Sequence, residues 1–314
     1  MLEPLPMTRN GVPQPGFAGA IRAADAKSRA IADSLEKASP LVPAWLMLFV
    51  FSFSLVRGGW PVIARPEALL TGVLVALGFW GRSRVEGRER HPLIADLSLW
   101  VAMAPGFILV ADASRRAADG RFDAAMASMD LDLFGISAPL WFASKFPSRW
   151  FHEWLEFAYF TYYLWIPAPG LLGWLAGPRA RIRAVLALSV SYTLTTGLEL
   201  ILATKGPLAD RATTVMESGP MKTLVDWVYR FDAHGGAAFP SSHVAVGTVG
   251  WWMVYCRHRM AGLLTFPIIV SMWFATLQGS FHYLVDVPAG LLVTVLALAL
   301  VRPGVALEPG APQR

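Results

Sequence analysis

The segment "AAFPSSHVAVG" (residues 237–247) is followed directly by "TVGWWMVYC" (residues 248–256), so that a polar turn leads straight into a long apolar run. A proline, two serines and a histidine come just before the apolar residues. Such a run is typical of a helix buried in a membrane or in a large core. Histidine changes its charge most readily near neutral pH, so its place at the start of this run requires an explanation.

The composition of the whole chain indicates a membrane protein. Of its 314 residues, 55% are hydrophobic and 16% are charged, and the mean hydropathy is +0.46. Soluble domains usually carry about 25% charged residues. The net charge of +5 comes from short basic clusters between apolar runs, which argues for topology signals and against a nucleic-acid-binding surface. Cys256 is the one cysteine, which excludes an intrachain disulfide and argues against a thiol-ligated metal site.

Eight apolar segments predict an all-α, polytopic transmembrane helical bundle. Several of them are shorter than the roughly 20 residues that a straight spanning helix needs, and the second is the weakest. The segments cover residues 41–56, 68–81, 93–111, 154–176, 184–203, 244–256, 262–278 and 284–301.

The distribution of basic residues predicts which ends of the segments share a side. If all eight segments cross, the two tails and the even-numbered gaps hold 16 Lys and Arg residues, and the opposite side holds 11. The short loops decide the orientation, because the rule counts charges close to helix ends. We therefore expect residues 1–40 and 302–314 to be cytoplasmic tails. The turn 277–286 and residues 204–243 then share the outer side, and the aromatic stretch 140–154 lies along that interface.

Two histidines and a carboxylate are expected to meet on the outer side. His282 and Asp286 are four residues apart, which on a helix places them on one face. A carboxylate can fix the tautomer of an imidazole and leave its other nitrogen free to act as a nucleophile or a base. His243 begins the neighbouring helix, and a helix N-terminus favours anions. This combination indicates phosphoryl transfer to or from a lipid head group.

A zinc site and a serine hydrolase are two other interpretations of these residues, and the sequence supports both less well. Two histidines and an aspartate could ligate zinc, but the sequence lacks two histidines four apart, the spacing of a zinc protease helix. Ser241 and Ser242 could serve a hydrolase, but they lack the G-x-S-x-G elbow and are better explained as helix caps. Taken singly, the remaining histidines are interpreted as ordinary interfacial residues; these are His91, His152, His234 and His258.

The motifs "PSSH" (residues 240–243) and "HYLVD" (residues 282–286) resemble the second and third motifs of the type-2 phosphatidic acid phosphatase superfamily. The resemblance implies that His282 is a nucleophile that forms a phosphohistidine, that Asp286 orients it, and that His243 protonates the leaving oxygen. Ser241 and Ser242, with backbone amides, would hold phosphate oxygens. No metal and no cofactor are implied.

The cationic residues depart from the family pattern. The first motif is a Lys followed by an Arg-Pro pair, whereas here Lys205 is followed by Arg211 without a proline. The third motif normally has an Arg six residues before its His, where this chain has Thr276. A phosphodiester carries less negative charge than a phosphomonoester, so a site with fewer cations is better matched to a diester. A smaller number of cationic residues is also typical of the branch of inositol phosphorylceramide and sphingomyelin synthases. Three further segments resemble that branch: "DLDLFG" (residues 130–135), "EFAYFTYY" (residues 156–163) and "KGP" (residues 205–207).

The resemblance implies a division of the chain and a choice of activities. Residues 93–301 would form a catalytic six-helix membrane domain, and residues 41–92 would add two N-terminal spans. The expected function is lipid head-group phosphotransfer on the outer face. The alternatives are a lipid phosphate phosphatase and a non-catalytic lipid-binding or transport protein. The expected partners are a lipid phosphate substrate and membrane lipids, with no nucleic acid, and the sequence leaves the lipid and the oligomeric state open.

Overall fold

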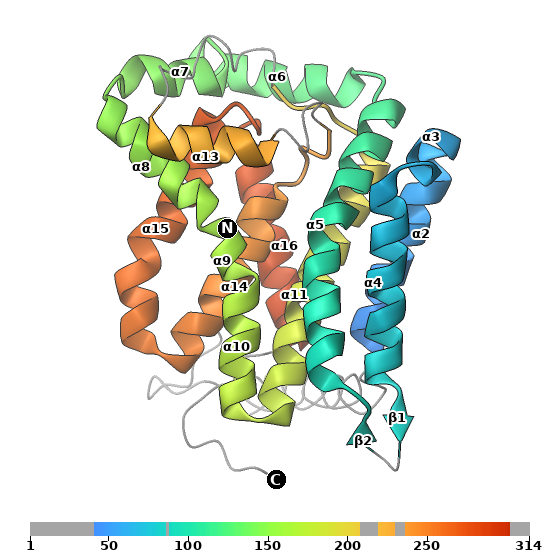
Figure 1. Cartoon of the computed structure of the whole chain (residues 1–314). Coiled ribbons are helices and arrows are strands. Elements are labelled where there is room, and N and C mark those ends of the chain that lie inside the picture. The colour runs from blue at the N-terminus through green and yellow to red at the C-terminus, as the bar shows by residue number, and fades with distance from the viewer. Residues whose placement is uncertain (1–40, 86–87, 208–218, 230–235, 302–314) are drawn as a thin grey trace, which may run out of the picture.

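The computed structural model describes residues 41–85, 88–207, 219–229 and 236–301. Within them the chain forms a bundle of helices that run between two ends of the molecule (Figure 1). The all-α architecture predicted from the sequence is confirmed; the one β structure in the described ranges is a hairpin of two residues per strand. The elements are α2 (Val42–Gly58), α3 (Trp60–Ile63), α4 (Pro66–Arg82), β1 (Arg84–Val85), β2 (Arg88–Glu89), α5 (Pro92–Ala117), α6 (Arg121–Phe134), α7 (Ala138–Lys145), α8 (Arg149–Phe160), α9 (Tyr162–Trp165), α10 (Pro167–Ala176), α11 (Pro178–Ile201), α13 (Pro220–Tyr229), α14 (Ser242–Arg257), α15 (Arg259–Gln278) and α16 (Asp286–Val301).

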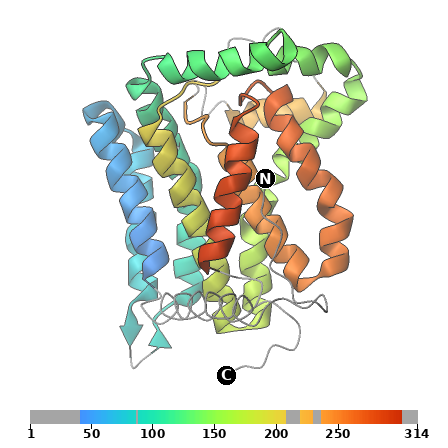
Figure 2. The same ribbon diagram turned by 180° about the vertical axis from the view of Figure 1, so that it is seen from behind.

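The connections alternate between the two ends of the bundle. One end, here called the upper end, carries α3, α6, α7, α13 and the turn 279–285 (Figure 1). The opposite, lower end carries the β1–β2 hairpin and the tight turns between α10 and α11 and between α14 and α15. Helices α6 and α7 lie across the upper end instead of crossing the bundle. Seen from behind, α11 and α16 lie side by side in the middle of the molecule (Figure 2).

Three helices of the described ranges are long and apolar enough to cross a bilayer. They are α5, α15 and residues 180–201 of α11, whereas α2 and α16 are shorter apolar helices. A helix rises about 1.5 Å per residue, so roughly 20 residues match the hydrocarbon thickness. The prediction of an integral membrane protein is therefore supported, while eight full crossings and the division at residues 92 and 93 stay predictions.

The predicted single segment 154–176 is broken into three helices. Helix α8 ends at Phe160, α9 covers one turn, and α10 begins at Pro167. A proline inside a helix removes one hydrogen bond and clashes with the carbonyl four residues earlier, so the chain restarts a helix there. The break lets α8 lean outward beneath α7, whereas α10 runs down beside α11 (Figure 1).

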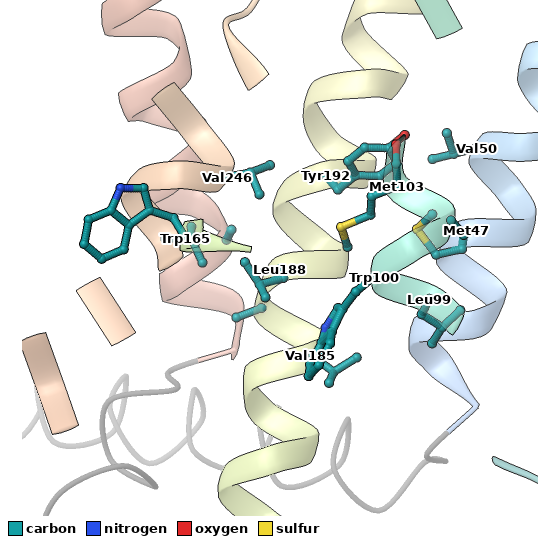
Figure 3. Packing of buried hydrophobic residues seen from close by; sticks show 14 of the residues in the cluster. Met47, Val50, Leu99, Trp100, Met103, Trp165, Val185, Leu188, Tyr192 and Val246 are labelled. Atoms are coloured by element: carbon teal, nitrogen blue, oxygen red, sulfur yellow. Dashed lines mark hydrogen bonds between the residues drawn. The ribbon is translucent and has the colours of Figure 1, made fainter. Parts of the chain in front are cut away.

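A shared apolar core joins the N-terminal helices to the rest of the bundle. Figure 3 shows Met47 and Val50 of α2 facing Leu99 and Met103 of α5, with side chains of α11 and α14 beyond them. Close packing of α4 on α5 depends on Gly78, where a Cβ atom would lie 2.7 Å from Leu99 Cδ2. Small residues allow helix backbones to approach closely in this way.

A buried group of charged side chains ties the lower end together. Asp96 of α5 accepts hydrogen bonds from Arg82 Nη2 (2.5 Å), Arg181 Nη1 (2.9 Å) and Trp174 Nε1 (3.2 Å). Arg181 also pairs with Glu89 of the hairpin at 2.7 Å. Helices α4, α10 and α11 thus bond the carboxylate of Asp96, which is fully buried, and the hairpin joins them through Glu89 and the arginines.

We predict that Asp96→Ala destabilises the protein strongly. The substitution leaves two buried guanidinium groups without their shared carboxylate, so the melting temperature in detergent should fall on the order of 10 °C. Asp119→Ala is the control, because Asp119 forms an exposed pair with Arg121. Such a pair contributes little to stability, so its loss should leave the melting temperature unchanged. Equal melting temperatures for the two variants would contradict a structural role for the buried group.

Candidate active site

Two polar turns meet at the upper end of the bundle and bring the predicted site residues together. The first turn, residues 236–241, leads into α14, and the second, residues 279–285, leads into α16. His243 is the second residue of helix α14, and Asp286 is the first residue of helix α16. The rings of His243 and His282 lie edge-on to each other, with centroids 6.2 Å apart and an interplanar angle of 64°.

His282 meets Asp286, but the two residues do not share a helix face. His282 lies in the irregular turn, and α16 begins only at Asp286. Asp286 Oδ2 accepts a hydrogen bond from the backbone N–H of Tyr283 at 2.9 Å, which folds the turn back over the helix start. The expectation of a helical pair is wrong on this point, because α16 begins only after His282, and the two side chains meet through the fold of the turn.

The hydrogen bonds of His282 define the tautomer of its ring. Nδ1 lies 2.7 Å from the carbonyl oxygen of Ala238 and 3.2 Å from Asp286 Oδ2. Both neighbours are acceptors, so Nδ1 carries the proton and Nε2 keeps its lone pair. Nε2 lies 3.1 Å from Ser241 Oγ, whose hydroxyl donates to it. The ring therefore presents an unprotonated nitrogen toward the start of α14.

Ser241 caps α14 and belongs to the same polar group. Its Oγ accepts a hydrogen bond from the backbone N–H of Val244 at 3.3 Å, as an N-cap residue does. Its own N–H donates to the carbonyl oxygen of Asp286 at 3.2 Å. Helix α16 approaches this turn closely at Gly290, where a Cβ atom would lie 2.7 Å from the carbonyl oxygen of Ser241. These contacts fix the two motifs against each other.

His243 lies among aromatic rings. Its ring stacks on Tyr159 at 4.5 Å and lies 4.2 Å from Tyr162, while Phe107 meets it edge-on at 6.5 Å. Both ring nitrogens are buried, and neither has a hydrogen-bond partner among the described residues. Buried polar atoms are nearly always satisfied, so such nitrogens point to a missing ligand.

Further buried polar atoms at the same place lack partners in the described part of the chain. They are Ser242 Oγ and Asp286 Oδ1. The N-terminus of α14 adds backbone N–H groups and the positive end of its dipole, which together favour an anion. The start of α14 thus brings a hydroxyl, an imidazole and backbone N–H groups close to His282.

The structure does not bring the predicted cationic side chains into contact with the two histidines in the residues that it describes. The side chain of Lys205 is exposed, and its backbone N–H donates to Asp123 at 3.0 Å. Arg211 lies outside the described residues. Thr276 is fully buried, and its hydroxyl donates to the carbonyl oxygen of Trp273 in its own helix. Its carbonyl oxygen accepts a hydrogen bond from the N–H of His282 at 3.2 Å, so this position supports the histidine through its backbone.

Helix α6 binds the turn 279–285 and the backbone at Lys205 through two carboxylates one heptad apart. Asp123 accepts hydrogen bonds from the backbone N–H groups of Lys205 and Gly206, at 3.0 and 2.9 Å, and from the hydroxyl of Tyr283 at 3.2 Å. Asp130 accepts from the backbone N–H groups of Leu284 (3.1 Å) and Ala138 (3.3 Å). The helix that lies across the upper end therefore holds the turn that carries His282.

Burial around α6 changes the ionisation of these groups. Burial raises the pKa of the Asp130 carboxyl, and hydrogen bonds from Leu284 and Ala138 partly oppose this shift. Burial, with the neighbouring Asp123 carboxylate, raises the pKa of the Tyr283 phenol. Tyr283 therefore remains a neutral donor to Asp123 at physiological pH.

The other described histidines have structural surroundings. His152 is buried, and its ring nitrogens lie 2.8 Å from the carbonyl oxygen of Phe146 and 2.7 Å from Gln278 Nε2. His91 stacks on Trp80 near the lower end. His234 lies outside the described residues. In the ranges that the structure describes, no three His, Cys, Asp or Glu side chains come together as a metal site.

Sequence reasoning missed Asp123, Tyr159 and Tyr162 as parts of the site. The two tyrosines fall three residues apart in the aromatic segment 156–163, a helical spacing that would have predicted a shared face. Asp123 gives no comparable signal, because its partners lie more than 80 residues away in the sequence.

We predict that Asp130→Asn loosens the turn 279–285. An amide offers one acceptor oxygen where the carboxylate accepts two N–H groups, and its NH₂ group opposes one of them. Hydrogen exchange measured by mass spectrometry should become faster in peptides that cover this turn. Asp132→Asn changes an exposed aspartate of the same helix and should leave the exchange unchanged. Unchanged exchange in Asp130→Asn would contradict the proposed support.

Comparison with known proteins gives one match. A family model described as the PAP2 superfamily matches residues 125–300, a range that holds both histidine motifs and α6 from residue 125 onward. No curated protein and no solved structure matches the chain.

Proposed function

The chain belongs to the PAP2 superfamily, and we propose that it moves a phosphate or a phosphorylated head group from a membrane lipid to an alcohol or to water. Members of the superfamily are phosphatases or phosphotransferases that act on lipid phosphates. The observation that carries the proposal is the arrangement of His282 and His243. One ring presents a lone pair, and the other, 6.2 Å away, has two nitrogens without a partner among the described residues.

In the first half of the proposed reaction, His282 Nε2 attacks the phosphorus of the lipid donor. The bond from phosphorus to the leaving oxygen breaks as the new P–N bond forms. His243, protonated at this stage, gives its proton to the leaving oxygen as a general acid. The products are a phosphohistidine and the departed lipid alcohol.

In the second half, His243 acts as a base. It takes a proton from the acceptor, whose oxygen attacks phosphorus while the P–N bond breaks. His282 returns to its starting tautomer, and His243 is again protonated. Water as the acceptor makes the enzyme a phosphatase, and a lipid hydroxyl makes it a head-group transferase.

Asp286 and the carbonyl of Ala238 orient the nucleophile from the side of its ring opposite Nε2. Both accept a hydrogen bond from the Nδ1–H group. These bonds aim Nε2 at the substrate and offset the positive charge that the ring gains on phosphorylation. The backbone carbonyl is the shorter of the two contacts. Two acceptors hold the ring more firmly than the carboxylate alone.

The charge of the phosphate is met mainly by neutral donors in this proposal. Ser241, Ser242 and the amides at the start of α14 bind phosphate oxygens, and Lys205 and Arg211 supply positive charge. Thr276 supplies none, which favours a phosphodiester donor with one negative charge. The transferase resembling inositol phosphorylceramide and sphingomyelin synthases is therefore preferred over the plain phosphatase. The basic loops at the lower end support a site on the outer side of the membrane.

We predict that His282→Ala abolishes turnover. The purified wild type and variant are assayed against a panel of lipid phosphomonoesters and diesters, following free phosphate and new lipid species together. Loss of the nucleophile should lower kcat by roughly 10⁴-fold or more and remove any acid-labile phosphoenzyme. His258→Ala, an exposed histidine at the opposite end, should retain full activity. Free phosphate indicates a phosphatase, and new diester lipid without free phosphate indicates a transferase.

Two results of that assay would contradict the proposal. Full turnover by His282→Ala would exclude the phosphohistidine mechanism. The absence of turnover by the wild type on every lipid phosphate tested would favour the non-catalytic alternative.

We predict that Asp286→Asn lowers kcat far more than it changes KM. The amide cannot stabilise the charged imidazole as a carboxylate does, so kcat should fall roughly 10²-fold or more, as when a histidine loses its orienting carboxylate in other enzymes. Substrate binding should change little, because Asp286 lies behind His282. Steady-state kinetics on the substrate found above would measure both constants. An unchanged kcat would show that Ala238 alone is sufficient.

A further inference from the structure

A cavity of about 590 Å³ extends from His243 along the bundle, between α5 and the α9–α10 segment. It is here called the α5–α10 groove. Its volume is within the roughly 300–1,000 Å³ range of sites that bind small organic ligands. The residues that carry the argument are Glu67, Leu97, Trp100, Ala104, Tyr162 and His243.

The two ends of the groove differ in polarity. Glu67 lies in the first turn of α4, at the upper end, and His243 belongs to the candidate active site. Leu97 and Trp100 lie near the start of α5, toward the lower end (Figure 1). The side chains between these ends are predominantly apolar. A ligand that fits this pattern has a polar group beside His243 and an apolar tail that points to the lower end.

Packing forms the base of the groove on one side at its lower part, while its outer side is open, since Leu97 is 44% exposed. Trp100 is pressed against α10 at Gly170, where a Cβ atom would lie 1.8 Å from the indole ring. Pro105 interrupts the hydrogen bonds of α5 midway along the groove. The groove therefore has a firm base and a wall formed by two helices.

Water is a poor occupant of such a space. A buried water needs two to four polar partners, and the apolar wall provides almost none below His243. Hydrocarbon fits the wall without losing hydrogen bonds. In a membrane-embedded protein the available hydrocarbon is a lipid chain.

From these observations we infer that the α5–α10 groove holds a hydrocarbon chain of the lipid phosphate substrate, with phosphorus at His243 and the chain directed toward Leu97 and Trp100. The inference rests on the proposed function and extends it. Helices α4 and α5 precede residue 125, where the match to the family model begins. The chain-binding wall is therefore contributed largely by a part of the protein that the family model does not cover, and chain selectivity is set there.

Photolabelling tests this inference without requiring turnover. The probe is phosphatidic acid with a diazirine near the end of one acyl chain, applied to the purified full-length protein in detergent. Labelled peptides are mapped by mass spectrometry. The wild type and His282→Ala should both be labelled on α5 and α10, because chain binding needs no nucleophile.

A matched pair of substitutions locates the binding site. Ala104→Phe places a ring in the groove at an exposed position of α5, and should reduce labelling of α5 and α10 about tenfold. Ala261→Phe makes the same exchange at an exposed position of α15 that does not line the groove, and should leave labelling unchanged. In turnover assays, Ala104→Phe should raise KM for long-chain substrates and spare a short-chain analogue.

The outcomes separate the two proposals. Labelling outside α5 and α10, or equal labelling of Ala104→Phe and wild type, would overturn the groove even if the protein turns over lipid phosphates. A third outcome is that Ala104→Phe removes the labelling of the groove but the wild type turns over no lipid phosphate. This result would support chain binding and contradict the proposed chemistry.

Discussion

The site depends on the hydrogen bonds at Nδ1 of His282. They join the carbonyl of Ala238, in the turn before α14, to the carboxylate of Asp286, at the start of α16. An imidazole in such surroundings must be satisfied on this side, because an unpaired polar group in a water-poor interior is costly. Once Nδ1 has its two acceptors, the tautomer is fixed and Nε2 is directed toward Ser241 at the start of α14. The close approach of α16 at Gly290 and the cap formed by Ser241 follow from the same contact between the two turns.

The turn that carries His282 is short and irregular, so it needs support from outside the bundle. Helix α6 provides it with Asp123 and Asp130, which accept hydrogen bonds from backbone or hydroxyl donors and need no cation for this purpose. Backbone N–H groups in a loop at a membrane surface would otherwise bond water and exchange freely. Their capture by a helix lying across the upper end turns a flexible connection into a defined part of the site.

The sequence predicted the parts of this protein that depend on local pattern. Apolar runs gave the helices, and the motifs at 240–243 and 282–286 gave the two histidines and Asp286, because each signal lies within a few residues. The break of the segment 154–176 is not predicted, because the continuous apolar composition extends past Pro167. The contacts of Asp123, and the packing of Tyr159 and Tyr162 against His243, join distant segments, which no local pattern encodes. The α5–α10 groove is likewise a property of how helices pack, and composition alone does not reveal it.

The shortage of cations and the groove are connected by the energetics of binding. A site that meets a phosphate mainly with hydroxyl and amide donors gains less from the head group than one with several arginines. The missing binding free energy can come from a remote part of the substrate, and a buried hydrocarbon chain supplies about 0.8 kcal/mol for each methylene removed from water. For a lipid that leaves a bilayer the gain is smaller, so in the proposed arrangement the groove acts mainly by holding the phosphorus between the two histidines. The proposed chemistry then depends on the two turns that carry His243 and His282, while the position of the substrate is set largely by α4 and α5. Under this proposal, a change in α5 alters which lipid is used without changing how its phosphorus reacts.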